Sequence, residues 1–131
     1  PEDLERYRVN KNDILFNRTN SRDLVGKVGL FDLEGDYVFA SYLVRIVVNE
    51  DDVDSRFLST LLNTDWNQQR IRGLATPGVS QCNINVENLK KLVVPIPPAP
   101  TQDAIARILG SLEEAIEATR AVIVLISARL M

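Results

Sequence analysis

The pattern of apolar and polar residues divides this chain into two parts with different periods. In the first part, short apolar runs bounded by turn-forming residues predict strands at residues 13–17, 26–31 and 38–48. Because short turns separate these runs, we expect the three strands to form an antiparallel meander. A last strand is predicted at residues 92–96, where Pro95 places its end at a sheet edge.

Between these strands, apolar residues recur at helical spacing. Residues 53–63 carry apolar side chains three and four positions apart, which predicts a helix. A second short helix is predicted at residues 65–72, with Thr64 as its N-cap. The polar residues 76–85 predict a turn followed by irregular chain, after which Asn85 caps a single helical turn.

The second part begins after a stiff proline-rich break at residues 97–100. From Thr101, an expected N-cap, one long helix of roughly 45 Å is predicted. Its apolar residues follow a heptad pattern with one polar position, Thr119. The predicted helix-packing residues are Ile105, Leu109, Leu112, Ile116, Ile123, Ile126 and Leu130. A helix packed on its own domain would carry a similar stripe, but the proline break favours a coiled-coil arm.

These elements together predict an α+β fold, in which a small, mostly antiparallel β-sheet with short helices precedes one long coiled-coil helix. We expect a compact domain at residues 1–97 and the helix at residues 98–131.

Composition argues against catalysis within this chain. It has 131 residues, a net charge of −3, one cysteine and no histidine. The commonest general base and the commonest metal ligand are therefore absent, and we expect neither catalytic nor metal-binding residues. No apolar run is long enough to cross a bilayer and no secretory signal is visible, so no membrane contact and a cytoplasmic location are expected.

Polar side chains that can bind DNA gather in two segments that the sequence predicts as loops. Arginine pairs with guanine edges and asparagine or glutamine with adenine edges, while lysine and arginine also hold phosphates. Candidates for base edges are Asn17, Arg18, Gln81 and Asn83, and candidates for phosphates are Lys27, Arg70, Arg72 and Lys90. Further DNA-binding candidates are Thr19, Asn20, Ser21, Arg22 and Ser80. Turns and helix caps use the same residue types, so a purely structural interpretation stays open.

Several segments resemble the specificity subunits of type I restriction-modification systems. Residues 13–21, 24–27 and 39–46 look like the second half of a target recognition domain of that family. Residues 83–98, followed by Gln102, are similar to the family's join between recognition domain and conserved helix. The order and spacing of these segments carry the resemblance.

The resemblance covers the chain from about Asn12 to its end, including residues 105–109 of the predicted helix. Thr101 departs from the family, which usually has an acid before the glutamine, although threonine also caps a helix. The chain is then expected to be the later part of one recognition domain plus one spacer helix.

The resemblance implies that this chain reads double-stranded DNA and leaves the reactions to partners. Methylation subunits would use S-adenosylmethionine, and restriction subunits would use ATP and Mg, while this chain holds no cofactor itself. The helix would set the distance between two recognition domains, and two copies could also pair through it. Two alternatives stay open: a protein–protein assembly module that touches no DNA, and the recognition module of a fused restriction-methylation enzyme.

Overall fold

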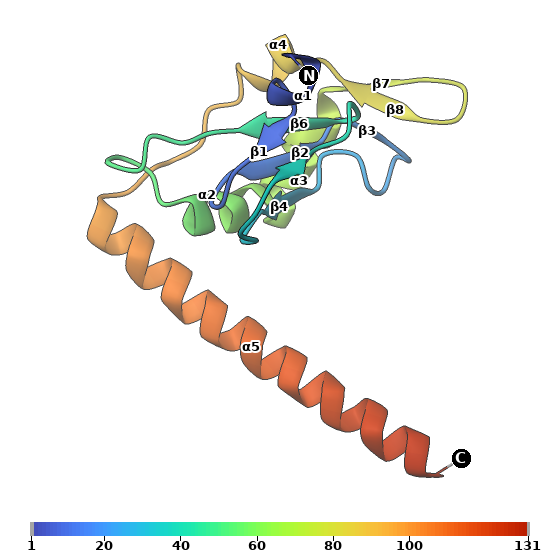
Figure 1. Ribbon diagram of the computed structural model, residues 1–131, viewed down its shortest axis with the longest axis vertical. Coiled ribbons are helices and arrows are strands. Elements are labelled where there is room, and N and C mark those ends of the chain that lie inside the picture. Colours follow the sequence, from blue (N-terminus) through green and yellow to red (C-terminus); the bar gives the residue numbers. More distant parts are fainter. Residues whose placement is uncertain (1, 131) are drawn as a thin grey trace.

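The computed structural model describes residues 2–130 and consists of a globular part, residues 2–98, and one long helix (Figure 1). The helices are α1 (Glu2–Glu5), α2 (Ser55–Leu62), α3 (Asp65–Gly73), α4 (Val86–Leu89) and α5 (Ala99–Leu130). The strands are β1 (Arg8–Val9), β2 (Ile14–Asn17), β3 (Thr19–Asn20), β4 (Val28–Leu30), β5 (Tyr37–Val38), β6 (Leu43–Ile46), β7 (Ala75–Pro77) and β8 (Cys82–Ile84). The predicted α+β class, with antiparallel sheets before a long helix, is confirmed.

The central sheet has the order β4–β2–β6, with both pairings antiparallel. Ile14 and Phe16 of β2 are fully buried, whereas no residue of β4 or β6 is fully buried. The middle strand therefore contributes the largest share of this sheet to the core. The predicted meander is wrong in this respect, because β6 pairs with β2 and not with β4.

The strand predicted at residues 38–48 is divided between two sheets. Tyr37–Val38 forms β5 and pairs with β1, whereas Leu43–Ile46 forms β6 in the central sheet. The chain turns between them, where Phe39 donates its backbone N–H to the Tyr7 carbonyl at 2.8 Å. The Tyr7 and Phe39 rings also pack edge to face, with centroids 5.6 Å apart. A continuous β-branched and aromatic run therefore does not make one continuous strand.

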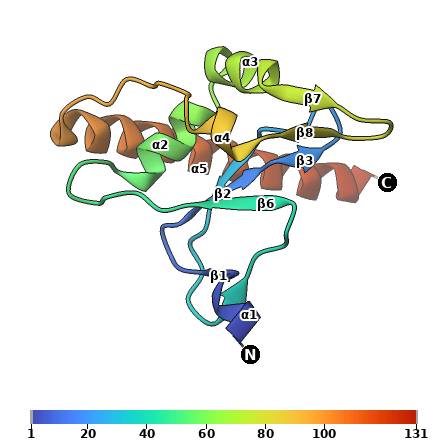
Figure 2. The same ribbon diagram turned by 90° about the horizontal axis from the view of Figure 1, so that it is seen from above.

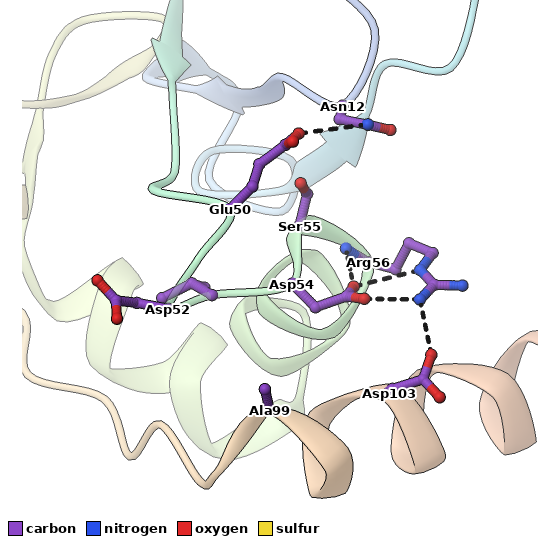
Figure 3. Close-up of a pocket in the computed structure, with 9 residues that line it drawn as sticks. Asn12, Glu50, Asp52, Asp54, Ser55, Arg56, Ala99 and Asp103 are labelled. Atoms are coloured by element: carbon purple, nitrogen blue, oxygen red, sulfur yellow. Dashed lines mark hydrogen bonds and ion pairs between the residues drawn. The ribbon is translucent and has the colours of Figure 1, made fainter.

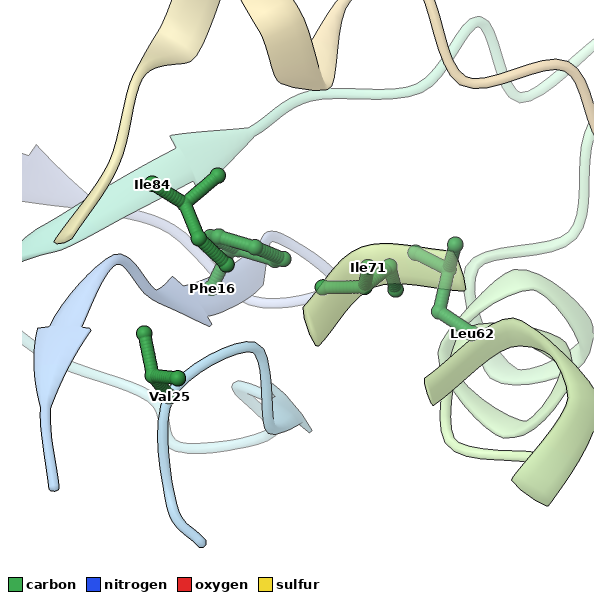
Figure 4. Close-up of a cluster of buried hydrophobic side chains, with 5 residues drawn as sticks. All are labelled: Phe16, Val25, Leu62, Ile71 and Ile84. Carbon is green, nitrogen blue, oxygen red and sulfur yellow. The ribbon is translucent and has the colours of Figure 1, made fainter. Parts of the chain in front are cut away.

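The core forms where α2 and α3 cover one side of the strands. Phe16, Val25, Leu62, Ile71 and Ile84 are buried together, although they come from five separate segments (Figure 4). Each such side chain contributes about 1.5–3 kcal/mol when it is fully buried. The helical periodicity of the sequence predicted these two helices, and both are confirmed within two residues at each end.

Side-chain amides connect the helices to the strands. Asn63, at the end of α2, donates to the Val28 carbonyl at 2.7 Å and accepts from the Val28 N–H at 3.1 Å. Gln68, which is 1% exposed, donates to the carbonyls of Gly26 and Leu62 at 2.8 and 2.9 Å. These bonds pair backbone groups of β4, of the loop before it and of the end of α2, and such groups are costly to bury unpaired.

An ion pair and a glycine complete the interior. Asp13 accepts from the Arg45 guanidinium across β2 and β6 at 2.6 Å, and Asp13 is buried. Gly26 has a φ of +87°, and a Cβ atom there would lie 2.5 Å from the Ile71 Cγ2. Only glycine fits such a position without strain.

Residues 91–98 cross the globular part without forming the predicted strand. Leu92 and Val94 pack against the core, whereas Val93 is exposed and its carbonyl accepts a hydrogen bond from Arg70 at 2.9 Å. The side chains of this segment do alternate between the core and solvent. Among the described residues, however, its hydrogen-bond partner at Val93 is the Arg70 side chain and not the backbone of a neighbouring strand. The prediction of a strand at residues 92–96 is wrong.

Helix α5 begins at Ala99, two residues before the predicted cap. Thr101 and Gln102 both donate their backbone N–H groups to the Pro98 carbonyl, so Thr101 lies in the first turn and is not the N-cap. Pro100 fits that turn because its missing N–H would have no partner there. Figure 1 shows that α5 extends away from the globular part after its first turns, and residues 111–130 are all exposed. Among residues 2–130, no helix is both long and apolar enough to cross a membrane.

Candidate nucleic-acid interface

The two polar segments of the sequence analysis meet in one sheet. Strand β3 pairs with β8, and β8 pairs with β7, to give the antiparallel order β3–β8–β7. We call these three strands the candidate sheet. Both segments were predicted as loops, and that prediction is wrong where the strands form, at residues 19–20 and 82–84. The predicted turn at residues 76–78 is likewise wrong, because Thr76 and Pro77 belong to β7.

One face of the candidate sheet carries a row of polar side chains. Thr19, Asn83 and Thr76 are directly opposite one another in the register, so they share a face. Asn83 is exposed, and its Nδ2 donates to the Thr19 Oγ1 at 3.0 Å. Ile84, the next residue along β8, is fully buried on the opposite face. The core therefore fixes which residues of this strand face outward.

Strands β7 and β8 form a hairpin that projects beyond the rest of the globular part (Figures 1 and 2). Its loop is closed by the Gly78 N–H, which donates to the Gln81 carbonyl at 2.8 Å. A Cβ atom at Gly78 would lie 2.6 Å from that carbonyl oxygen, so glycine is required for this turn. The predicted binding residues Ser80 and Gln81 lie exposed in this loop, beside the fully exposed Val79.

A cavity of about 400 Å³ lies on the other face of the hairpin, next to the end of α3. Two of the predicted residues, Arg22 and Arg72, line it from different segments, together with Cys82 and Gln69. Within the part of the chain that the structure describes, neither guanidinium forms an ion pair or a hydrogen bond. The structure thus brings two cationic groups together that are 50 positions apart in the sequence, and leaves both available to an external anion.

The other predicted residues near the candidate sheet differ in whether they have hydrogen-bond partners within the chain. Asn17 donates to the Leu24 carbonyl at 3.3 Å, and Asn20 accepts from the Ser21 N–H at 2.8 Å. Arg18 is half-buried, and its Nε is buried without a hydrogen-bond partner among the described residues. Lys27 is exposed. The turn chemistry considered as an alternative therefore operates at Asn20, while Lys27 remains open to solvent.

Two predicted phosphate-binding residues are engaged within the chain. Arg70 donates to Asn67 at 3.1 Å and to the Val93 carbonyl at 2.9 Å, and its guanidinium lies 4.4 Å from the centre of the Trp66 ring. Lys90 pairs with Glu87 at 2.8 Å, and this partner lowers the pKa of the exposed Glu87 carboxyl. Arg70 holds residues 91–98 against α3, so its role in the structure is to connect two segments.

The predicted packing stripe of α5 is largely uncovered in this chain. Ile105 is half-buried and lines an apolar hollow with Phe57 and Leu61 of α2. Beyond it, exposure rises from 39% at Leu109 to 83% at Leu130. The stripe continues through Leu112, Ile116, Ile123 and Ile126, all more than half exposed. A helix packed along its own domain would bury this stripe, so that alternative does not describe the structure.

Sequence reasoning missed one residue of the candidate sheet and one of its hairpin loop. Thr76 lies opposite Asn83 on the polar face, and Val79 is the most exposed apolar residue of the hairpin. The signal for the hairpin was present as two short segments, residues 75–77 and 82–84, separated by four residues that include Gly78. The neighbouring Pro77 masked it, because proline before glycine is typical of a turn.

The sequence matches the family described as type I restriction modification DNA specificity domain over residues 1–126. This match spans nearly the whole chain, and the chain therefore belongs to that family. The resemblance inferred from residues 13–21, 24–27, 39–46, 83–98, Gln102 and 105–109 is confirmed.

Three curated relatives agree with this assignment. A specificity subunit assigned to the type I restriction enzyme MjaX of Methanocaldococcus jannaschii is 30% identical over 116 residues. The StySPI specificity subunit of Salmonella potsdam is 29% identical over 104 residues, and the EcoEI specificity subunit of Escherichia coli is 25% identical over 114 residues. These alignments cover 88%, 78% and 83% of this chain, but only 27%, 22% and 18% of the relatives. The chain thus spans about a quarter of their length or less.

Proposed function

We propose that this chain recognises double-stranded DNA sequence as part of a type I specificity subunit, and that the candidate sheet makes the contacts. One observation carries the proposal: two polar segments, far apart in sequence, converge in an exposed sheet whose hairpin projects from the globular part. Membership in the DNA specificity domain family supports it. The alternative of a pure assembly module does not account for the exposed polar face of the candidate sheet.

The shape and chemistry of the hairpin fit a DNA groove. The major groove of B-form DNA admits a two-stranded β-ribbon, and asparagine pairs with adenine edges through two hydrogen bonds. Asn83 lies on the outward face of such a ribbon, and Arg22 and Arg72 line the cavity on its other face, where they would contact phosphates at the edge of the groove. The net charge of −3 does not oppose this arrangement, because DNA responds to the local cations and not to their sum over the chain.

We further infer that partner subunits carry out the reactions. The relatives are named specificity subunits of restriction enzymes, which supports a division of labour in this family. Methylation subunits with S-adenosylmethionine, and restriction subunits with ATP and Mg, would then assemble around this protein. The uncovered stripe of α5 favours a second role, in which the helix contacts protein while the candidate sheet contacts DNA.

The decisive experiment first finds the bound sequence and then removes one contact. Random duplexes are selected on the intact specificity subunit, and affinities for the selected and a scrambled duplex are measured at several salt concentrations. Asn83→Ala is expected to weaken the selected duplex by about 1–3 kcal/mol, relax preference at one base pair and leave the scrambled duplex unchanged. Asn88→Ala, at an exposed asparagine of α4 outside the candidate sheet, is the matched control.

Two results would contradict the proposal at different levels. If selection returns no preferred sequence, sequence recognition itself is wrong. If a sequence is selected but Asn83→Ala weakens both duplexes equally, the candidate sheet does not contact base edges and recognition lies elsewhere in the subunit.

A further inference from the structure

The join between α2 and α5 contains a buried side chain with an unusually complete set of hydrogen bonds. Gln102, in the second turn of α5, is 1% exposed. Its Oε1 accepts from the Asp54 N–H at 2.8 Å, while its Nε2 donates to the carbonyls of Asp52 and Pro97 at 2.9 and 2.8 Å. One amide therefore binds the chain before α2, the proline-rich connection and α5 at a single point.

No other side chain of similar size offers the same groups. The three backbone partners are one N–H and two carbonyls, so the site requires one acceptor and two donors in one plane, as an amide provides. Glutamate could accept from Asp54, but it would bring a negative charge toward two carbonyl oxygens. Methionine would fill the space and leave all three backbone groups without this partner.

The contacts around Gln102 are weaker or more exposed. Asp54 caps α2 by accepting from the Phe57 N–H at 3.0 Å, and it pairs with Arg56, which reaches Asp103 of α5 at 3.1 Å (Figure 3). Both Arg56 and Asp103 are half-exposed, so solvent weakens this link. Ala106, one turn after Gln102, is buried and lets α5 approach α2 closely.

The contacts of α5 with the globular part end near Gly110, which is half-buried and lines a cavity with β4. Residues 111–130 are all exposed. A helix rises about 1.5 Å per residue, so a 10° change of direction at Gln102 moves the far end by roughly 7 Å. The first three turns therefore determine where the rest of the helix lies.

We infer that Gln102 is a positioning residue that fixes the direction of α5 relative to the globular part. This inference depends on the geometry of the join and not on DNA binding. For the proposed function it means that the separation between this candidate sheet and any other part attached to α5 depends on this buried amide.

Distance measurements between paired spin labels test this directly. Labels are placed at Asp65→Cys in α3 and Ser127→Cys in α5, in a Cys82→Ser background, and labelled chains are diluted into unlabelled ones. We expect one narrow distance distribution, which Gln102→Met broadens at least twofold. A second label pair, Ser111→Cys with Ser127→Cys, lies within α5 and is expected to stay narrow in both proteins.

Gln68→Met is the matched control, because Gln68 is an equally buried amide whose donors bind only carbonyls of the globular part. It is expected to lower the melting temperature without broadening the distribution between Asp65→Cys and Ser127→Cys. The inference is overturned if Gln102→Met leaves the distribution narrow, or if Gln68→Met broadens it as much. Should Gln102→Met not fold, Gln102→Asn decides in the same way, because its amide is one methylene too short to reach all three partners.

Discussion

The two three-stranded sheets of the globular part have the same antiparallel pairing but opposite surroundings. In the central sheet, the middle strand buries Ile14 and Phe16, and the Asp13–Arg45 pair lies partly buried across it. In the candidate sheet, the middle strand buries Ile84 alone and turns Asn83 to solvent. The central sheet therefore stabilises the core. The candidate sheet is positioned by the core and presents polar groups to solvent.

The largest expected effect contrasts the middle strands of the two sheets. Phe16→Ala removes a fully buried ring and should lower the free energy of unfolding by about 3–5 kcal/mol. Asn83→Ala should change it by no more than about 0.5 kcal/mol, because its side chain is exposed. Urea denaturation of both variants measures the contrast, and similar losses would show that the candidate sheet is also part of the stabilising core.

A smaller effect is expected where the segment between the sheets passes α3. Gly26→Ala would need a positive φ and would push a methyl group against Ile71, for a loss of about 2–4 kcal/mol. Gly29→Ala is the matched control, since a Cβ there meets nothing within 4 Å. Thermal unfolding followed by circular dichroism compares the two, and equal melting temperatures would contradict the close packing of Gly26.

The two arginines in the last turn of α3 are expected to affect different properties, one the stability of the fold and the other the affinity for DNA. Arg70→Ala should cost about 1–2 kcal/mol of stability, because two hydrogen bonds and the stacking on Trp66 are lost. Arg72→Ala should leave stability unchanged but weaken binding to all duplexes and reduce the salt dependence by about one phosphate contact. Unfolding and DNA titrations of both variants decide, and the reverse pattern would exchange their roles.

The smallest effect concerns acid pH at the start of α2. Hydrogen bonds from Arg56 lower the pKa of Asp54 below its ordinary value of 3.8. A lowered pKa in the folded state means that ionised Asp54 adds stability above that ordinary value, and that this stability is lost as the pH falls through the lower folded value. Asp54→Asn keeps a capping oxygen but does not titrate, so it should be less stable than the parent by about 1 kcal/mol or less at pH 7. Denaturation at pH 7 and pH 3 should show this gap narrowing, and a constant gap would contradict the pairing.

Local patterns of the sequence predicted local structure well. Strand β2, helices α2 and α3 and the cap at Asn85 were predicted from apolar spacing and capping residues alone, since these depend on neighbours in the chain. The long helix was also predicted, although its start was placed two residues late because Thr101 is a good cap and Pro100 is an equally good first-turn residue.

Pairings between distant segments could not be predicted from the sequence. Strand β3 has two residues, too few for any periodicity, and its partner Asn83 is 64 positions away from Thr19. The position of β6 beside β2 depends on which strand buries best, and that is a property of the whole core. Positive charge likewise did not reveal that Arg70 binds the Val93 carbonyl while Arg72 remains free of partners among the described residues.

The bare stripe of α5 has a thermodynamic consequence. Isolated helices are only marginally stable in water, and residues 111–130 of α5 are all exposed. Whatever covers the stripe binds the helical form of these residues and not the unfolded form, so it adds to the free energy of unfolding this part of the helix. The thermal unfolding of α5 should therefore move to higher temperature as the concentration of the partner rises.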